Sequence, residues 1–141
     1  MQFELDDVFN KYLHITYRQK VDVARETIAD MADFLLKLEV GEEDRVNFYI
    51  NLVRLFAGAD QKFSLEECKL FNDIFSINLT YKEFTSLMVS HDEEFVENMD
   101  KIIDMMDENA KVSACSFGLV FLSVDRNITD SERKVFERIL A

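Results

Sequence analysis

Apolar residues recur along this chain at the spacing of an α-helix. After Thr16, apolar side chains step by three or four residues over about five turns, at Val21, Ala24, Ile28, Met31, Leu35 and Leu38. Positions spaced in this way lie on one face of a helix, so the pattern predicts a long amphipathic helix over 17–38. Gly41 is typical of a helix end, and the acidic residues at 42–44 suit the first turn of a next helix, predicted to run to about Ala59.

Helix starts are marked by a recurring capping box, in which a Ser or Thr precedes a Glu or Gln by three residues. The hydroxyl accepts a hydrogen bond from the third helical N–H, and the Glu or Gln accepts one from the N–H of the capping residue. Five such boxes occur, at Thr16–Gln19, Ser64–Glu67, Thr80–Glu83, Ser90–Glu93 and Thr129–Glu132. Each is predicted to begin a helix.

The segment 91–108 separates into an apolar and an acidic face. The apolar side is predicted to pack through Phe95, Met99, Ile102 and Met106. The other side, here called the acidic stripe, consists of Glu93, Glu97, Asp100, Asp104 and Asp107. Helical spacing places the two sets on nearly opposite sides, so one is expected to be buried and the other solvated.

A pattern of the form D-x-x-[FI]-[ST]-x-x-E occurs twice, 65 residues apart, as GADQKFSLEE at 58–67 and VDRNITDSE at 124–132. The same shift aligns positions beyond the loop, namely Leu52 with Phe117, Phe56 with Phe121, Lys69 with Lys134, Phe71 with Phe136 and Ile74 with Ile139. We therefore predict a repeated helix-loop-helix at about 45–76 and 110–141. Two such units are expected to pack against each other, because two repeats are too few for a solenoid.

Composition supports a single all-α domain over residues 1–141. The chain is 48% hydrophobic with no Pro and three Gly, so it has few of the residues that punctuate sheets and loops. A chain of this length can bury enough of its surface on folding to form a hydrophobic core. We expect a bundle of about seven to eight helices, in which the two cysteines, Cys68 and Cys115, are buried free thiols.

The net charge of −12 limits the partners. It repels nucleic acid and anionic membrane surfaces, and it favours cations or a basic protein surface. The N-terminal MQFELDDVF lacks a basic segment ahead of an apolar one, and the apolar run at 117–124 is too short to cross a bilayer. The expectation is a cytoplasmic protein without membrane insertion.

The aspartates of the repeated loops need an explanation that the glutamates do not. Glu67 and Glu132 are accounted for as capping residues, but Asp60 and Asp125 fall where a helix ends and oppose its dipole by about 0.3–1 kcal/mol. An Asx-turn to the loop backbone is one explanation. The other is a hard cation, calcium or magnesium rather than zinc, with Asp60, Glu67, Asp125 and Glu132 as candidate ligands.

The loop is not an EF-hand. Counting from Asp60, Phe71 stands where that motif requires a bidentate Glu, and Leu65 stands where it requires Gly.

At these residues the sequence resembles the tellurite-resistance TerB-like family, whose signature is an apolar helix ending in Ala-Asp-Gly, then an apolar residue and an acidic helix start. The matching residues are Ala59, Asp60, Phe63 and Glu67, and again Val124, Asp125, Ile128 and Glu132. The resemblance covers roughly 45–140. It implies a bacterial, cytoplasmic helical bundle linked to stress response, with acidic loop residues that bind a divalent metal.

The family's Gly is replaced here by Gln61 and Arg126. Because Gly adopts positive φ at least cost, this replacement argues against a tight left-handed turn. It also allows Arg126 to pair with Asp125, which favours the first loop over the second as a cation site.

Three functional hypotheses follow. The first is a non-enzymatic module that binds a divalent cation through the repeated acidic loops. The second is a metal-independent interaction module that docks a basic protein on the acidic stripe, with binding that weakens at high salt. The third, an enzyme, is not expected, because the chain has no Ser-His-Asp set, phosphate-binding loop or zinc-ligand spacing.

Overall fold

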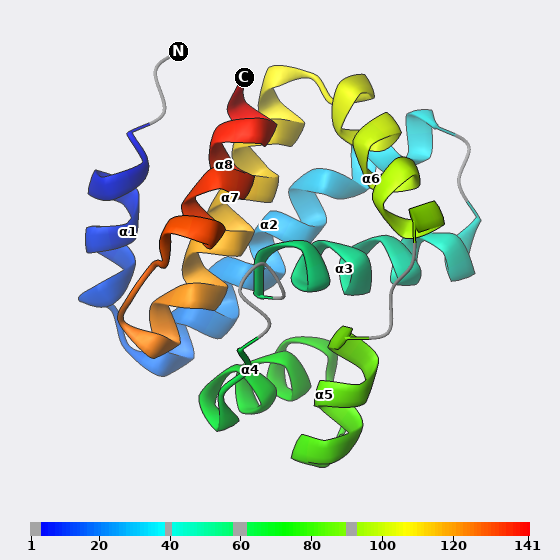
Figure 1. The fold of residues 1–141 in the computed structure, drawn as a ribbon. Coiled ribbons are helices and arrows are strands. Elements are labelled where there is room, and N and C mark those ends of the chain that lie inside the picture. Colours follow the sequence, from blue (N-terminus) through cyan, green and yellow to red (C-terminus); the bar gives the residue numbers. More distant parts are fainter. Residues whose placement is uncertain (1–3, 39–40, 58–61, 90–92) are drawn as a thin grey trace.

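The computed structural model describes residues 4–38, 41–57, 62–89 and 93–141, and all its regular elements there are helices (Figure 1). In chain order they are α1 (Leu5–Leu13), α2 (Tyr17–Lys37), α3 (Glu42–Ala57), α4 (Leu65–Phe75), α5 (Tyr81–Val89), α6 (Glu93–Met105), α7 (Glu108–Leu122), the 3-10 turn η1 (Ser123–Asp125) and α8 (Asp130–Leu140). The all-α prediction is confirmed.

Capping boxes begin four of these helices, as predicted. Both reciprocal hydrogen bonds are present at Thr16, Ser64, Thr80 and Thr129, which precede α2, α4, α5 and α8. The fifth predicted box starts at Ser90, which lies outside the described residues. Such a cap contributes about 0.5–2 kcal/mol to helix stability, so these boundaries are set locally.

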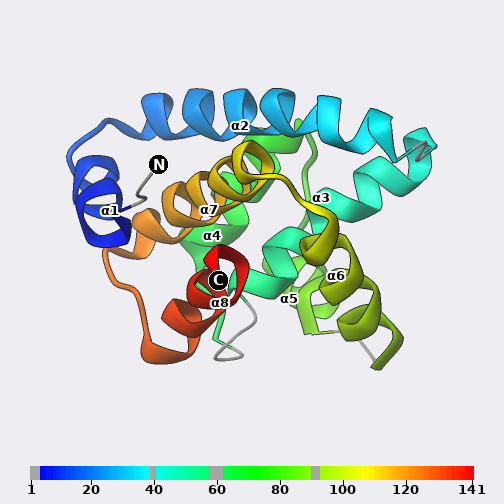
Figure 2. The same ribbon diagram turned by 90° about the horizontal axis from the view of Figure 1, so that it is seen from above.

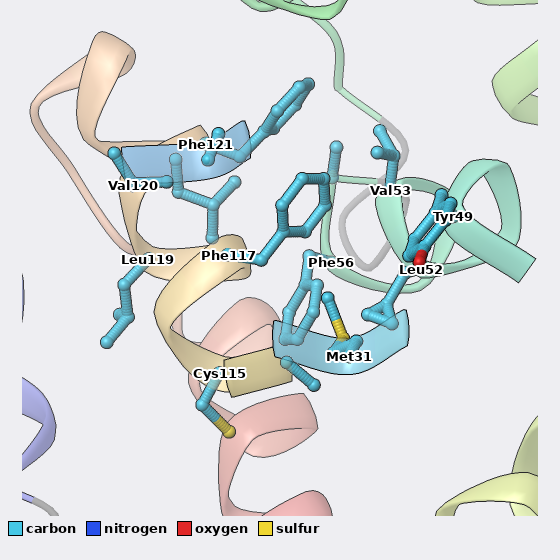
Figure 3. Close-up of a cluster of buried hydrophobic side chains, with 14 of the residues drawn as sticks. Met31, Tyr49, Leu52, Val53, Phe56, Cys115, Phe117, Leu119, Val120 and Phe121 are labelled. Carbon is cyan, nitrogen blue, oxygen red and sulfur yellow. The ribbon is translucent and has the colours of Figure 1, made fainter. Parts of the chain in front are cut away.

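Helix α7 is the centre of the bundle. It packs against α1, α2, α3, α4 and α8, and α2 lies along it over much of its length (Figures 1 and 2). Nearly every residue of its C-terminal half is buried, which explains why the apolar run of 117–124 shows no helical alternation. Figure 3 shows Phe117, Val120 and Phe121 of α7 in one cluster with Met31 and Phe56.

The residues aligned by the 65-residue shift have matching burial. Each aligned apolar pair is buried on both sides, and Lys69 and Lys134 are both exposed. The two units also pack against each other, since α3 contacts α7 and α8, while α4 contacts α7 and η1. Through the contact between α4 and η1, the two repeated loops are brought together. We call the loop at 58–67 the first corner and the loop at 124–132 the second corner.

Helix α2 holds α4 through polar contacts as well as apolar ones. The Arg25 guanidinium donates to the carbonyl oxygens of Asp73 at 2.7 Å and Ile74 at 3.3 Å, near the C-terminus of α4. A cation is favoured at that end of a helix. The Tyr17 hydroxyl donates to the Asp73 carboxylate from the same face of α2.

Two features differ from the sequence interpretation. Helix α1 was not predicted, although Phe9 and Tyr12 lie one turn apart, are buried and pack towards α7. Helix α6 ends at Met105, so Asp107 is not on it; its Oδ1 instead accepts a hydrogen bond from Ala110 N at 2.8 Å and caps α7. An Asp cap stabilises a helix start, and that local preference ends the acidic stripe early.

Cys68 and Cys115 are both buried and free, as predicted. Within the described residues, no helix combines the length and apolar character needed to cross a membrane.

Gly118 allows α7 to approach the ring of Phe56 on α3. A Cβ built at Gly118 would lie 2.8 Å from three atoms of that ring, which is itself fully buried and stacks on Phe136 at a centroid distance of 4.6 Å. A methyl group at this position therefore requires the ring or the helix to shift within a closely packed interior.

We expect Gly118→Ala to lower the free energy of unfolding by roughly 1–3 kcal/mol through overpacking, despite the better helix propensity of Ala. Urea denaturation measures the change. Ser113→Ala, at a partly exposed position of the same helix, is the control and should change stability by less than about 0.5 kcal/mol. Equal stability of Gly118→Ala and the wild type would contradict the tight contact.

Candidate functional site

The two repeated corners meet in the folded chain. Asp125 is the last residue of η1 and therefore follows the C-terminal end of α7. Ser64 caps α4 at the other corner, and its Oγ donates to Asp125 Oδ1 at 2.6 Å. This hydrogen bond joins residues 61 positions apart and connects the two units directly.

The hydrogen bond to Ser64 also bears on the Asx-turn that the sequence left open. In the described part of the chain, the Asp125 carboxylate accepts from the hydroxyl of Ser64, which belongs to the other unit. At the second corner, the aspartate therefore forms a hydrogen bond that joins the two units. Asp60, its counterpart in the first corner, lies outside the described residues.

Glu67 is the most deeply buried acidic residue of this site, with 1% of its surface exposed. Its Oε1 accepts the capping hydrogen bond from Ser64 N at 2.8 Å, whereas its Oε2 is enclosed and accepts none from the residues that the structure describes. The carboxyl group of Asp125 lies within hydrogen-bonding reach of Glu67. Two ionised carboxylates cannot donate to each other, so the pair requires a proton or another positive charge between them.

Burial raises the pKa of Glu67 to about 8, and the negative charge of Asp125 is the next cause. The backbone N–H of Ser64 acts in the opposite direction, because it favours the charged carboxylate. Without another cation, the Glu67 carboxyl is therefore largely protonated at neutral pH and can donate to Asp125.

Glu132 occupies the matching position in the second corner. It is 5% exposed, and its Oε1 accepts from Thr129 N at 2.8 Å. Its charge further raises the pKa of Glu67. Of the four predicted ligands, the fold thus brings three close enough for Asp125 and Glu132 to raise the pKa of Glu67. Even so, in the described ranges no group of three or more His, Cys, Asp or Glu side chains is placed to hold a metal ion together.

Arg126 adopts the left-handed conformation that the missing glycine argued against. Its φ is 61° and its ψ is 23°, and its N–H donates to Ser123 O at 3.1 Å. A residue with a Cβ adopts this conformation at a cost of about 1 kcal/mol or more. The predicted ion pair between Arg126 and Asp125 does not form. The ion pairs between described residues involve the arginines Arg133 and Arg138.

The acidic stripe is exposed but partly used within the chain. Glu97, Asp100 and Asp104 are exposed on α6, and the side chain of Glu93 is not among those described. Arg138 of α8 lies 3.5 Å from Asp100 and 2.9 Å from Asp104. These contacts reduce the charge that the stripe presents to a basic partner, and docking there remains a prediction.

Comparison of the chain with models of protein families, with curated proteins and with solved structures found no match.

Proposed function

We propose that this protein is a non-enzymatic helical module that binds a divalent cation where its two repeated corners meet. Glu67 and Asp125 are the principal ligands in this proposal, Ser64 positions Asp125, and Glu132 adds negative charge. The observation that carries the proposal is the enclosed Glu67 Oε2, which has no hydrogen-bond partner among the described residues. Asp125 is held beside Glu67, because Ser64 donates through its N–H to Glu67 and through its Oγ to Asp125. A cation between the two would satisfy both.

The oxygen-only ligand set favours calcium or magnesium over zinc, because hard cations prefer carboxylate, carbonyl and water oxygens. Two carboxylates do not complete the coordination of either ion. Asp60, the sequence counterpart of Asp125, is a further proposed ligand on the basis of the repeat, and water and loop carbonyls would supply the rest. The link to stress response and tellurite resistance rests on the TerB-like resemblance alone.

Titration of metal-free protein with calcium, magnesium, manganese and zinc tests the proposal. We expect saturable binding at millimolar concentrations or below, seen by calorimetry and as a rise in Tm, because a ligand that binds only the folded state stabilises it. Glu67→Gln should weaken binding by at least about tenfold, or about 1.4 kcal/mol. Gln keeps the capping hydrogen bond but removes the negative charge.

Glu83→Gln is the matched control, since Glu83 completes an equivalent capping box at Thr80 but is exposed. Its binding should equal that of the wild type. Asp60→Asn tests the first corner in the same way. Absence of saturable binding by the wild type, or equal binding by Glu67→Gln, would mean that a proton alone occupies the gap between Glu67 and Asp125.

A further inference from the structure

A second feature of the same corners is a pocket of about 300 Å³ that gathers positive charge. It lies where the connection between α1 and α2, the start of α2, the start of α4 and the loop after η1 come together. Among the described residues, three cationic side chains line it, Lys20, Lys69 and Arg126, together with one carboxylate, Glu66. This local excess of cations stands out in a chain whose net charge is −12.

Lys20 is the buried residue among these three cations. The residue is only 7% exposed, and its Nζ donates to Ser123 O at 3.2 Å. An ammonium group has three donors, and in the described part of the chain this carbonyl is the acceptor that Lys20 uses. Burial and the nearby charge of Arg126 lower the pKa of Lys20. A buried ammonium next to a second cation is unfavourable unless a negative charge lies close by.

Neither of the other two cations, Lys69 and Arg126, forms an ion pair with an acidic side chain of the described residues. The Lys69 ammonium lies 4.5 Å from the ring centroid of Tyr17, which orients it by a cation–π contact. Arg126 forms no ion pair with any described carboxylate. Its left-handed backbone places a guanidinium at a position where glycine would be less strained. Strain of this kind, kept at a pocket, points to a use for the side chain.

The remaining wall is apolar and restricts the ligand. Leu13, Ile15 and Val124 line the pocket beside the cations. A volume near 300 Å³ suits a small molecule, and the mixed lining suits one with a charged head and an apolar body.

We propose that this pocket binds a small organic anion, a carboxylate or phosphate monoester that carries an apolar group. Its head would contact Lys20, Lys69 and Arg126, and its apolar group would cover Leu13, Ile15 and Val124. This site is separate from the cation site. Its charged side chains are mainly cationic, and none of the proposed cation ligands lines the pocket.

Calorimetric titration with hexanoate and with hexyl phosphate tests the proposal and distinguishes the two head groups. We expect saturable binding of at least one of them, and weaker binding of acetate and inorganic phosphate, which lack the apolar part. Arg126→Gly should weaken binding by about tenfold, the effect of losing one charge-assisted contact. Lys69→Gln, at an exposed position, should weaken it in the same direction.

Arg126→Gly is informative because glycine relieves the left-handed backbone, so the variant should fold with an unchanged or higher Tm. Ser76→Gly is its matched control. Ser76 is the other described residue with positive φ, 55°, and it does not line the pocket. It should gain stability and retain anion binding. The proposal would be overturned if neither hexanoate nor hexyl phosphate bound saturably, or if Arg126→Gly bound the anion as tightly as the wild type. It would also be overturned if inorganic phosphate bound as tightly as hexyl phosphate.

Discussion

Between about pH 5 and pH 8, the free energy of unfolding of the metal-free protein is expected to fall as the pH rises. The pKa of Glu67 is raised from 4.5 to about 8 in the folded state. Over this interval the folded chain holds a proton that the unfolded chain has released, so raising the pH favours unfolding. The slope from this one group is at most about 1.4 kcal/mol per pH unit, and the total loss is on the order of several kcal/mol.

Glu67→Gln should remove this contribution. The Gln amide can donate to Asp125 and accept from Ser64 N at every pH, which are the two contacts of a protonated Glu67. We expect the variant to be more stable than the wild type at pH 8 and about equally stable near pH 5. Urea denaturation at intervals of one pH unit measures both curves, and their difference isolates Glu67 from the other titrating groups.

Glu83→Gln should leave the pH dependence of the wild type nearly intact. A wild-type curve parallel to that of Glu67→Gln would contradict the raised pKa. Added divalent cation should oppose the loss of stability at high pH, because the ion binds the ionised carboxylates and competes with the proton.

Phe56→Ala is expected to cost about 3–5 kcal/mol of unfolding free energy, because it opens a cavity in the centre of the bundle. Phe56 is completely buried, stacks on Phe136 of α8 and touches the backbone of α7 at Gly118. It therefore joins three helices, and few alternative side-chain positions exist to fill its place. Guanidinium denaturation gives the change, and Leu65→Ala, at a position that is 66% exposed, should change stability by less than about 0.5 kcal/mol.

The Phe56→Ala background should reverse the effect of Gly118→Ala. Without the ring, the added methyl group no longer clashes, fills part of the cavity and improves helix propensity. We expect the double variant to be more stable than Phe56→Ala alone. Additive destabilisation by the two substitutions would show that the cost at Gly118 comes from some contact other than the Phe56 ring.

Much of the candidate site could be predicted because its parts are local. A capping box requires two side chains three residues apart, and such a box forms at Ser64, Thr80 and Thr129 as expected. The same shift that aligned the loops aligned core positions with matching burial. What the loop pattern could not provide was the hydrogen bond from Ser64 to Asp125, since it depends on how the two units pack.

Arg126 shows the limit of a rule applied one residue at a time. The absence of glycine argued against a left-handed turn, yet the turn forms with Arg at φ 61°. The backbone cost is about 1 kcal/mol, which the packing of α7, η1 and α8 around the corner can outweigh.

From its sequence alone, this protein is determined to be helical, with helix starts set by capping boxes and buried faces set by apolar spacing, because these depend on residues within one or two turns. The tertiary structure alone decided that Glu67 and Asp125 face each other and that Lys20, Lys69 and Arg126 share a pocket. Charges far apart in the chain interact strongly only when packing brings them close together and removes the water between them. Burial between packed helices, which no local pattern specifies, is what changes the chemistry of an ordinary capping glutamate.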